Sequence, residues 1–185
     1  MSTLIRDVYE RASLVFSGRY YTTINELTDQ IPALRPEVLW EAGLQIVGRG
    51  DFACDKLLVE EDKGAAIGAV VSVMTGVPLA MARPYAYSIP SIKVAYDSEY
   101  VRGDLYMNGI EPGERVVIVD DTISTGGVVT ALIDAIRGAG ATVHDAVALV
   151  EKVDNDGVRR VREATGVTVK TVLRIRIEDG RVVVL

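Results

Sequence analysis

Residues 116–127 read Val-Val-Ile-Val-Asp-Asp-Thr-Ile-Ser-Thr-Gly-Gly, and they join an apolar run, an acidic pair and a stretch of small residues. The unbroken β-branched run at 116–119 predicts a strand covered on both faces of an α/β sheet and ending at Asp120. Ligand crevices of open α/β sheets lie beyond the carboxyl ends of their strands. We therefore expect Asp120 and Asp121 at the mouth of such a crevice.

The residues after the acidic pair have the composition of an anion-binding loop. Their small side chains and glycine pair leave backbone N–H groups free to face an anion. Apolar residues then recur at helical spacing from Val128 to Ile136, and Gly138 reads as the stop of that helix. The positive end of the helix should face the loop, which predicts a phosphate site. The alternative is an ordinary βα turn with an acidic cap. The loop consists of Thr122, Ile123, Ser124, Thr125, Gly126 and Gly127.

This segment resembles, position by position, the phosphoribosyl pyrophosphate (PRPP) signature of type I phosphoribosyltransferases. The resemblance implies that Asp120 and Asp121 bind the ribose hydroxyls and that loop 122–127 holds the 5′-phosphate. The loop is neither a Walker A motif nor Gly-x-Gly-x-x-Gly. The implied fold is α/β: a central, mainly parallel sheet flanked by helices, within a single domain of residues 1–185. A small hood from about residues 1–35 and a C-terminal hairpin complete it.

Composition agrees with one enzyme-sized domain that has no need of cross-links. The chain has 185 residues, of which 49% are hydrophobic and 25% charged. A net charge of −6 argues against nucleic-acid binding through phosphate neutralisation. A single cysteine excludes an internal disulfide and favours a reducing cytoplasm. No apolar stretch approaches the ~20 residues that span a bilayer, so we expect neither membrane nor nucleic-acid partners.

The hydrophobic pattern predicts two βαβ units and a terminal hairpin. A helix is expected from the start of the chain to about Phe16, and another after Pro36. The crossovers of the βαβ units should be right-handed. A final Asp-Gly turn joins the last two strands. The expected core elements are a strand at 56–59, a helix at 65–75, a strand at 78–81, the signature strand and its helix, and strands at 143–150, 167–177 and 181–185.

Residues 83–113 form the least regular part of the chain, with three prolines and five tyrosines. Long irregular connections inside a compact domain are typically functional or disordered. We interpret this segment as a mobile lid, with Tyr96 and Tyr100 as its candidate residues, that keeps water from a reacting sugar. The alternative is a plain surface hairpin.

A second candidate anion site, Glu60-Glu61-Asp62-Lys63-Gly64, follows the first core strand. Lys63 and the free amide of Gly64 are placed to meet a pyrophosphate; the alternative is a solvated charge run. The position resembles the pyrophosphate loop of these transferases, and Arg83 stands where the family has a basic residue for the same group. The charged triplet departs from the more neutral residues typical of the family. The resemblance thus implies a pyrophosphate site of Glu61, Asp62, Lys63, Gly64 and Arg83.

The stretch around Glu151 and Lys152 resembles the base-recognition segment of purine transferases. Lys152 can donate to a 6-oxo group, whereas Glu151 can accept from an exocyclic amine or anchor the lysine. The alternative is an exposed ion pair at a strand end. No aromatic residue follows to stack on a base, so Tyr21, with Tyr20, is the candidate for stacking.

Over nearly its whole length the chain resembles the archaeal hypoxanthine/guanine phosphoribosyltransferase family. The resemblance implies transfer of phosphoribose from PRPP to hypoxanthine or guanine, with adenine as a further substrate. It also implies Mg²⁺ carried mostly by substrate and water, touched indirectly by Asp120 and Asp121. The implied assembly is a homodimer. Two alternatives remain: a PRPP-binding regulator without transferase activity, for which no helix-turn-helix is visible, and an orotate or other pyrimidine transferase.

Overall fold

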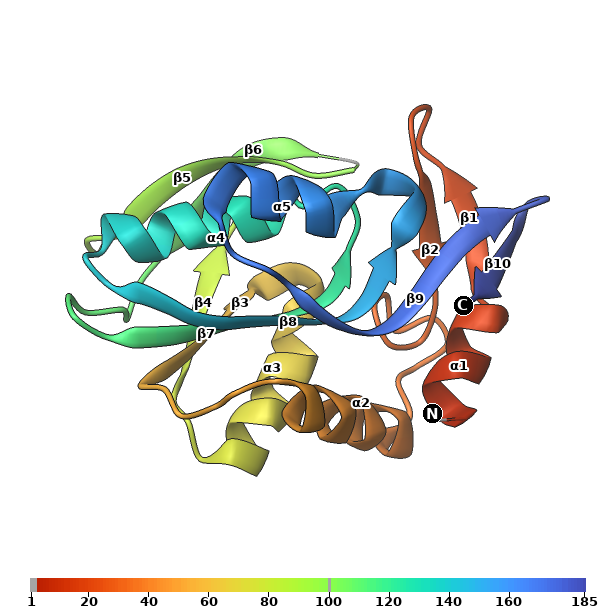
Figure 1. Ribbon diagram of the computed structural model, residues 1–185, viewed down its shortest axis with the longest axis horizontal. Helices are drawn as coiled ribbons and strands as arrows, with labels where there is room; N and C mark the ends of the chain where they lie inside the picture. Colours follow the sequence, from red (N-terminus) through yellow and green to blue (C-terminus); the bar gives the residue numbers. More distant parts are fainter. Residues whose placement is uncertain (1–2, 100) are drawn as a thin grey trace.

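An eight-stranded sheet runs through the described part of the chain, residues 3–99 and 101–185 of this computed structural model (Figure 1). Its five central strands are parallel, and the edge strands at both sides are antiparallel. The predicted mainly parallel α/β sheet is therefore confirmed. In sheet order the strands are β10 (Arg181–Val184), β9 (Lys170–Glu178), β8 (Thr142–Lys152), β7 (Arg115–Ile123), β3 (Lys56–Glu60), β4 (Leu79–Arg83), β6 (Arg102–Met107) and β5 (Ile92–Asp97).

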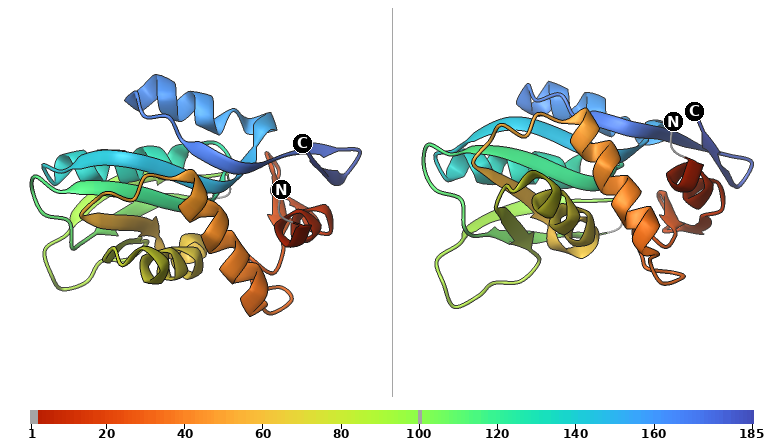
Figure 2. Two further views of the ribbon diagram at one scale, coloured as in Figure 1. Left: turned by 60° about the horizontal axis from the view of Figure 1, so that its bottom comes forward. Right: turned by 90° about the horizontal axis from the view of Figure 1, so that it is seen from below.

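Helices cover both faces of the sheet. Helices α2 (Pro36–Arg49) and α3 (Glu61–Thr75) lie on one face, and α4 (Gly127–Gly138) and α5 (Gly157–Thr165) lie on the other (Figure 2). Strand β7 supplies both cores, because Val117 and Val119 pack toward α2 and α3 while Val116 and Ile118 pack toward α4. Alternate side chains of one strand point to opposite faces, so an unbroken apolar run is what this central position requires.

The amino-terminal segment lies beside the last hairpin (Figure 1). Helix α1 (Thr3–Glu10) is tied to β10 by Arg6, whose guanidinium donates to the Val184 carbonyl at 3.3 Å. The predicted helix to Phe16 was wrong in its second half: β1 (Ser13–Phe16) pairs with β2 (Tyr21–Ile24). The β-branched and aromatic residues there favour a strand, and Gly18, at φ +88°, supplies the reversal.

Three further boundaries differ from the sequence expectations. The segment 83–113 is only partly irregular: β5 and β6 form an antiparallel hairpin on the sheet edge, and residues 84–91 and 108–113 form neither helix nor strand. The expected loop 61–64 is the first turn of α3, and β7 continues past Asp120 to Ile123. A short 3₁₀ turn, η1 (Val153–Asn155), and α5 were not predicted, because α5 carries only a narrow apolar stripe among arginines.

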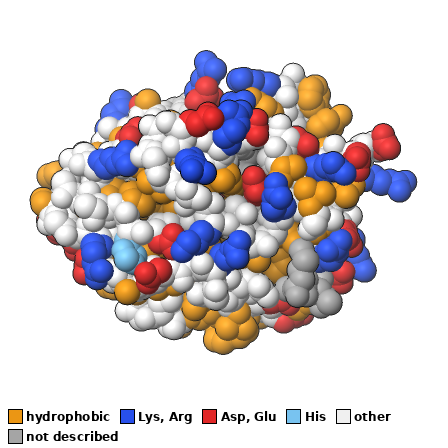
Figure 3. Space-filling view, in the orientation of Figure 1, with side chains coloured by type: hydrophobic (Ala, Val, Ile, Leu, Met, Phe, Trp, Pro, Cys, Tyr) orange, Lys and Arg blue, Asp and Glu red, His pale blue; other side chains and the backbone are white. Residues whose placement is uncertain are grey.

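One face of the molecule carries charges of both signs side by side (Figure 3). On the face shown in Figure 3, Lys and Arg side chains alternate with Asp and Glu, and hydrophobic side chains gather at the lower edge, where α2 lies in Figure 1. Two of the large exposed apolar residues of α2 are Trp40 and Leu44. Among the described residues, no helix is long and apolar enough to cross a membrane.

Candidate active site

The acidic pair lies at the carboxyl end of the central strand β7. Asp120 and Asp121 are only 6% and 5% exposed, although both line a cleft. The backbone N–H of Asp121 donates to Oδ1 of Asp120 at 3.0 Å. Burial, followed by the charges of Asp121 and Glu60, raises the pKa of Asp120 well above its usual range, and burial also raises the pKa of Asp121. Two carboxylates held this close favour a partner that supplies hydroxyl donors or positive charge.

The loop that follows is closely packed, and two glycines make this packing possible. Gly126 has φ +83°, and a Cβ atom built there would lie 2.8 Å from the carbonyl oxygen of Gly157, at the start of α5. A Cβ atom at Gly127, the first residue of α4, would collide with the carbonyl oxygen of Asp97, the last residue of β5. Side chains are thus excluded where the backbone amides and the helix N-terminus meet, the arrangement that suits an anion.

The other end of the loop is anchored from the amino-terminal segment. The fully buried Tyr9 of α1 has its hydroxyl 3.2 Å from Oγ1 of Thr122. Burial is the main cause that raises the pKa of Tyr9, so its phenol stays protonated and keeps a donor for this contact. Helix α1 therefore helps to hold the first residue of the loop.

The end of β3 and the first turn of α3 bring a third carboxylate and a lysine to the cleft. Glu60 is the last residue of β3, and Lys63 lies in the first turn of α3. The ammonium of Lys63 donates to Oδ1 of Asp29 at 2.8 Å. Burial alone would raise the pKa of Asp29, but hydrogen bonds from Lys63 and Thr28 lower it on balance. Asp29 is thus an ionised partner that holds Lys63 at the edge of the cleft.

Burial is the largest of the causes that raise the pKa of Glu60 to about 7, with the charges of Asp62 and Asp121 adding to it. Below pH 4.5 the carboxyl is protonated in the folded and unfolded chain alike; between 4.5 and about 7 the unfolded chain loses this proton first. The contribution of Glu60 to folding therefore falls as pH rises through this window. We expect Glu60→Gln to gain stability relative to the parent chain from pH 4.5 to 7, as measured by urea denaturation.

The exposed Glu111→Gln variant is the control for that measurement, because it removes a carboxylate that is not buried. The charge of Glu60 also raises the pKa of Asp120, so Glu60→Gln makes ionisation of Asp120 less costly and adds to the gain in the same direction. A stability difference between Glu60→Gln and the parent chain that is the same at pH 4.5 and at pH 7 would contradict the raised pKa of Glu60.

The remaining residues predicted to bind pyrophosphate divide between two cavities. Glu61 and Asp62 line a neighbouring cavity of about 750 Å³ together with Glu60 and Tyr96, whereas Lys63 lines the cleft. Arg83 reaches back from β4 and donates to Oε1 of Glu61 at 2.9 Å. Gly64 packs beside Asp120, because a Cβ atom there would lie 3.9 Å from the Asp120 carboxylate. Glu61 thus neutralises the charge of Arg83, which the sequence predicted to bind pyrophosphate.

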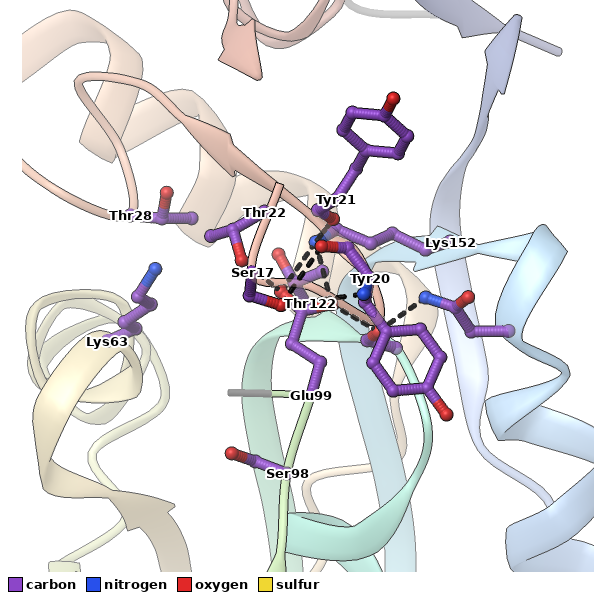
Figure 4. Close-up of polar contacts among 12 residues, drawn as sticks. Ser17, Tyr20, Tyr21, Thr22, Thr28, Lys63, Ser98, Glu99, Thr122 and Lys152 are labelled. Atoms are coloured by element: carbon purple, nitrogen blue, oxygen red, sulfur yellow. Dashed lines mark hydrogen bonds and ion pairs between the residues drawn. The ribbon is translucent and has the colours of Figure 1, made fainter. Parts of the chain in front are cut away.

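Only one of the two polar residues at the end of β8 reaches the cleft. Lys152 lines it and is fully engaged: its Nζ lies 2.8 and 3.0 Å from the two carboxylate oxygens of Glu99 and 3.1 Å from the Tyr21 carbonyl oxygen (Figure 4). Glu151 points to the opposite face of the strand and accepts a hydrogen bond from Arg174 at 3.0 Å. It does not line the cleft.

The aromatic ring of Tyr21 also points away from Lys152 (Figure 4). It is 42% exposed and packs 5.0 Å from the ring of Phe16, centroid to centroid. Together with Tyr20 and Lys152 it lines a groove of about 640 Å³. Tyr21 therefore contributes its backbone carbonyl to Lys152 but does not line the cleft, whereas Lys152 lines both the cleft and this groove.

The cleft joins segments that are far apart in the sequence. It has an empty volume of about 610 Å³ and is lined by three hood threonines, the end of β3, the β5–β6 turn, the signature and β8. Sequence reasoning missed Glu99 and the threonines, because isolated polar residues form no recognisable sequence pattern. It also left Glu60 out of the site, although this residue adjoins the predicted pyrophosphate site. The lining residues are Thr22, Thr23, Thr28, Glu60, Lys63, Ser98, Glu99, residues 120–129 and Lys152.

Comparison with known proteins identifies the family. No protein-family model matches the chain. It is 36% identical over 184 residues to the hypoxanthine/guanine phosphoribosyltransferase of Methanocaldococcus jannaschii, and the match covers 98% of this chain and 100% of that relative. The chain belongs to the archaeal hypoxanthine/guanine phosphoribosyltransferase family. The resemblance carried by residues 116–127 is thereby confirmed.

Solved structures of phosphoribosyltransferases share the fold. The adenine phosphoribosyltransferase of Rhodothermus marinus is 25% identical, has a TM-score of 0.74, and matches over 93% of this chain and 98% of that chain. The corresponding enzyme of Thermoanaerobacter pseudethanolicus is 21% identical, with a TM-score of 0.73 and coverage of 93% and 99%. The expected type I phosphoribosyltransferase fold is therefore confirmed for this member of the family.

Proposed function

We propose that this protein transfers the 5-phosphoribosyl group of PRPP to a purine base, with release of pyrophosphate. Hypoxanthine and guanine are the proposed bases, because full-length relatives are named for them. One observation carries the proposal. The buried Asp120–Asp121 pair lies in the same cleft as a helix N-terminus and a loop whose close packing requires glycine. Such a cleft offers separate places for ribose hydroxyls and for a phosphate.

Each part of the site would perform one task in this reaction. Asp120 and Asp121 would accept hydrogen bonds from the ribose hydroxyls, and loop 122–127 would bind the 5′-phosphate through its amides. Lys63 and Arg83 would neutralise the departing pyrophosphate after exchanging their present partners, Asp29 and Glu61. Positioning the purine nitrogen against C1 of the ribose then supplies much of the rate.

A Mg²⁺ ion fits the site as a substrate-borne cation. The described residues contain no group of three or more acidic, histidine or cysteine side chains able to cage a metal. One or two carboxylates plus substrate oxygens are what Mg²⁺ commonly takes, and Asp120 and Asp121 meet that requirement. The ion would neutralise charge on the pyrophosphate.

Lys152 is the proposed contact for the purine base. An ammonium has donors only, so it matches the 6-oxo group of hypoxanthine or guanine better than the amino group of adenine. We expect Lys152→Met to lower kcat/KM for hypoxanthine by about 10- to 100-fold, the scale of one hydrogen bond to a charged group, and to lower that for adenine less. Steady-state kinetics with each base measures both values.

The neighbouring residue provides the matched comparison. Glu151→Gln changes a charge at the same strand end, but on the face away from the cleft. Equal losses for hypoxanthine in the two variants would contradict a specific role for Lys152 and would restore Glu151 as a base-binding candidate.

Product formation from PRPP and Mg²⁺ with hypoxanthine, guanine, xanthine and adenine, each offered separately, tests the function. Nucleotide and pyrophosphate should appear together with at least one 6-oxopurine. PRPP binding without turnover of any base would favour the alternative of a PRPP-binding regulator, and turnover of orotate or uracil alone would favour a pyrimidine transferase. The assay should be run at low and at high salt, because the acidic, arginine-rich composition suits a salt-adapted source.

Three further features belong to this proposal. The β5–β6 hairpin would act as the lid: Tyr96 lines the cavity beside Glu60, and Tyr100 lies outside the described residues. The protein would act as a homodimer. It would work in the cytoplasm, where its substrates are made and its single cysteine stays reduced.

A further inference from the structure

A fully buried tyrosine hydroxyl lies behind the acidic pair. Tyr9, on α1, is 0% exposed and does not line the cleft. Its hydroxyl oxygen is 3.2 Å from Oγ1 of Thr122, which lines the cleft directly after Asp121. Either hydroxyl could supply the proton of this hydrogen bond. The direction of the bond decides whether the single proton of Thr122 remains available to the cleft.

A second neighbour of the phenol indicates that direction. Asn25 is 4% exposed, and its Oδ1 accepts hydrogen bonds from the backbone N–H groups of Leu27 at 2.9 Å and Thr28 at 3.1 Å. An amide oxygen has two lone pairs, so Asn25 has only its Nδ2 donors left for the phenol. Among the described residues, no acceptor lies in hydrogen-bonding geometry to this buried Nδ2.

The pKa of the tyrosine agrees with a donor on this side. Burial is the main cause that raises the pKa of Tyr9, whereas the Asn25 amide lowers it, as a donor facing the phenol oxygen does. The phenol oxygen therefore faces an N–H group, and the phenol proton is directed to Thr122.

The proton of Thr122 is then left for the cleft. Its oxygen accepts from Tyr9, so the hydroxyl donates to another group. Burial is the main cause that raises the pKa of Asp121, and the Thr122 hydroxyl is the largest of the causes that lower it. The Thr122 proton thus points toward the Asp121 carboxylate and helps to fix its orientation.

We propose that Tyr9 is a positioning residue for the ribose-binding carboxylate: a hydrogen-bond relay of Asn25, Tyr9 and Thr122 holds Asp121 in place for the ribose hydroxyls. This inference rests on the proposed function, since ribose is the group that Asp121 would bind. Successive hydrogen bonds polarise one another, and a carboxylate that is already oriented loses less freedom when the substrate arrives. Helix α1 thus acts on the cleft from the core, although none of its residues lines it.

Calorimetric titration with ribose 5-phosphate and, separately, with pyrophosphate and Mg²⁺ tests this role. Tyr9→Phe keeps the buried ring and removes one neutral hydrogen bond, so we expect ribose 5-phosphate to bind about 3- to 10-fold more weakly. Pyrophosphate contains no ribose, and its affinity should equal that of the parent chain. A purely structural defect would weaken the binding of both ligands.

Changes at Thr122 test the path of the relay. Valine has the shape of threonine without the hydroxyl, so Thr122→Val should weaken ribose 5-phosphate binding, and adding Tyr9→Phe should cause no further loss. Thr122→Ser keeps the hydroxyl and should retain most of the parent affinity. This pair also decides the matter if Tyr9→Phe does not fold, because equal affinity in Thr122→Val and Thr122→Ser would overturn the proposal.

Tyr106→Phe is the matched control, because it removes a phenol hydroxyl from β6, outside the cleft. Its affinity for both ligands should equal that of the parent chain. Unchanged ribose 5-phosphate affinity in Tyr9→Phe would contradict the relay, as would an equal loss for pyrophosphate or additive losses in the double variant. Failure of the parent chain to bind either PRPP or ribose 5-phosphate would instead overturn the proposed function.

Discussion

Gly126→Val should abolish detectable PRPP binding, a loss of about 100-fold or more. Two independent costs combine at this position. The residue has φ +83°, which a β-branched side chain rarely adopts, and its Cβ atom would lie 2.7 Å from Val161 and 2.8 Å from the Gly157 carbonyl oxygen. The loop must therefore move away from α5, and its amides lose the arrangement that suits a phosphate. Calorimetric titration with PRPP and Mg²⁺ measures the loss.

Gly76→Val separates backbone strain from damage to the site. Gly76 also has positive φ, at +72°, but it ends α3 with open space around its Cβ direction and does not line the cleft. This control should lose stability and retain PRPP affinity. Wild-type affinity in Gly126→Val would show that loop 122–127 is not the phosphate site.

Asp121→Asn should weaken PRPP binding by about 10- to 100-fold, the value of a charge-assisted hydrogen bond to a ribose hydroxyl. The same change should leave the free energy of unfolding unchanged or higher. Burial raises the pKa of Asp121, and its charge raises the pKa of Asp120, so the amide removes an unfavourable ionisation. Lower affinity combined with undiminished stability distinguishes a binding group from a structural one.

Asp134→Asn is the control for that variant, because Asp134 lies exposed on α4, the helix that follows the loop. It should change neither quantity. Asp120→Asn, measured beside it, compares the two carboxylates: a larger loss for Asp120 would give that residue the main contact with ribose. Unchanged affinity in both Asp120→Asn and Asp121→Asn would remove the acidic pair from the site.

Local sequence pattern was sufficient to predict structure where the residues that determine it lie in one segment. The run 116–119, the acidic pair and the glycines lie in one segment, so the strand, its burial on both faces and the start of α4 could all be predicted from them. The same pattern misjudged Ser13–Phe16 as helix, because pairing with β2 decides that stretch. It also missed α5, whose burial depends on packing against α4 and loop 122–127.

The sequence by itself determined the fold class, the family resemblance and the residues of the PRPP signature, because each of these depends on neighbours along the chain. Only the tertiary structure decided which charges meet. Glu99 is 53 residues from Lys152, and Asp29 is 34 from Lys63, yet the side chains of each pair are in direct contact. Partners so distant in sequence are set by how the hood and the edge hairpin fold over the sheet, and no local spacing records that geometry.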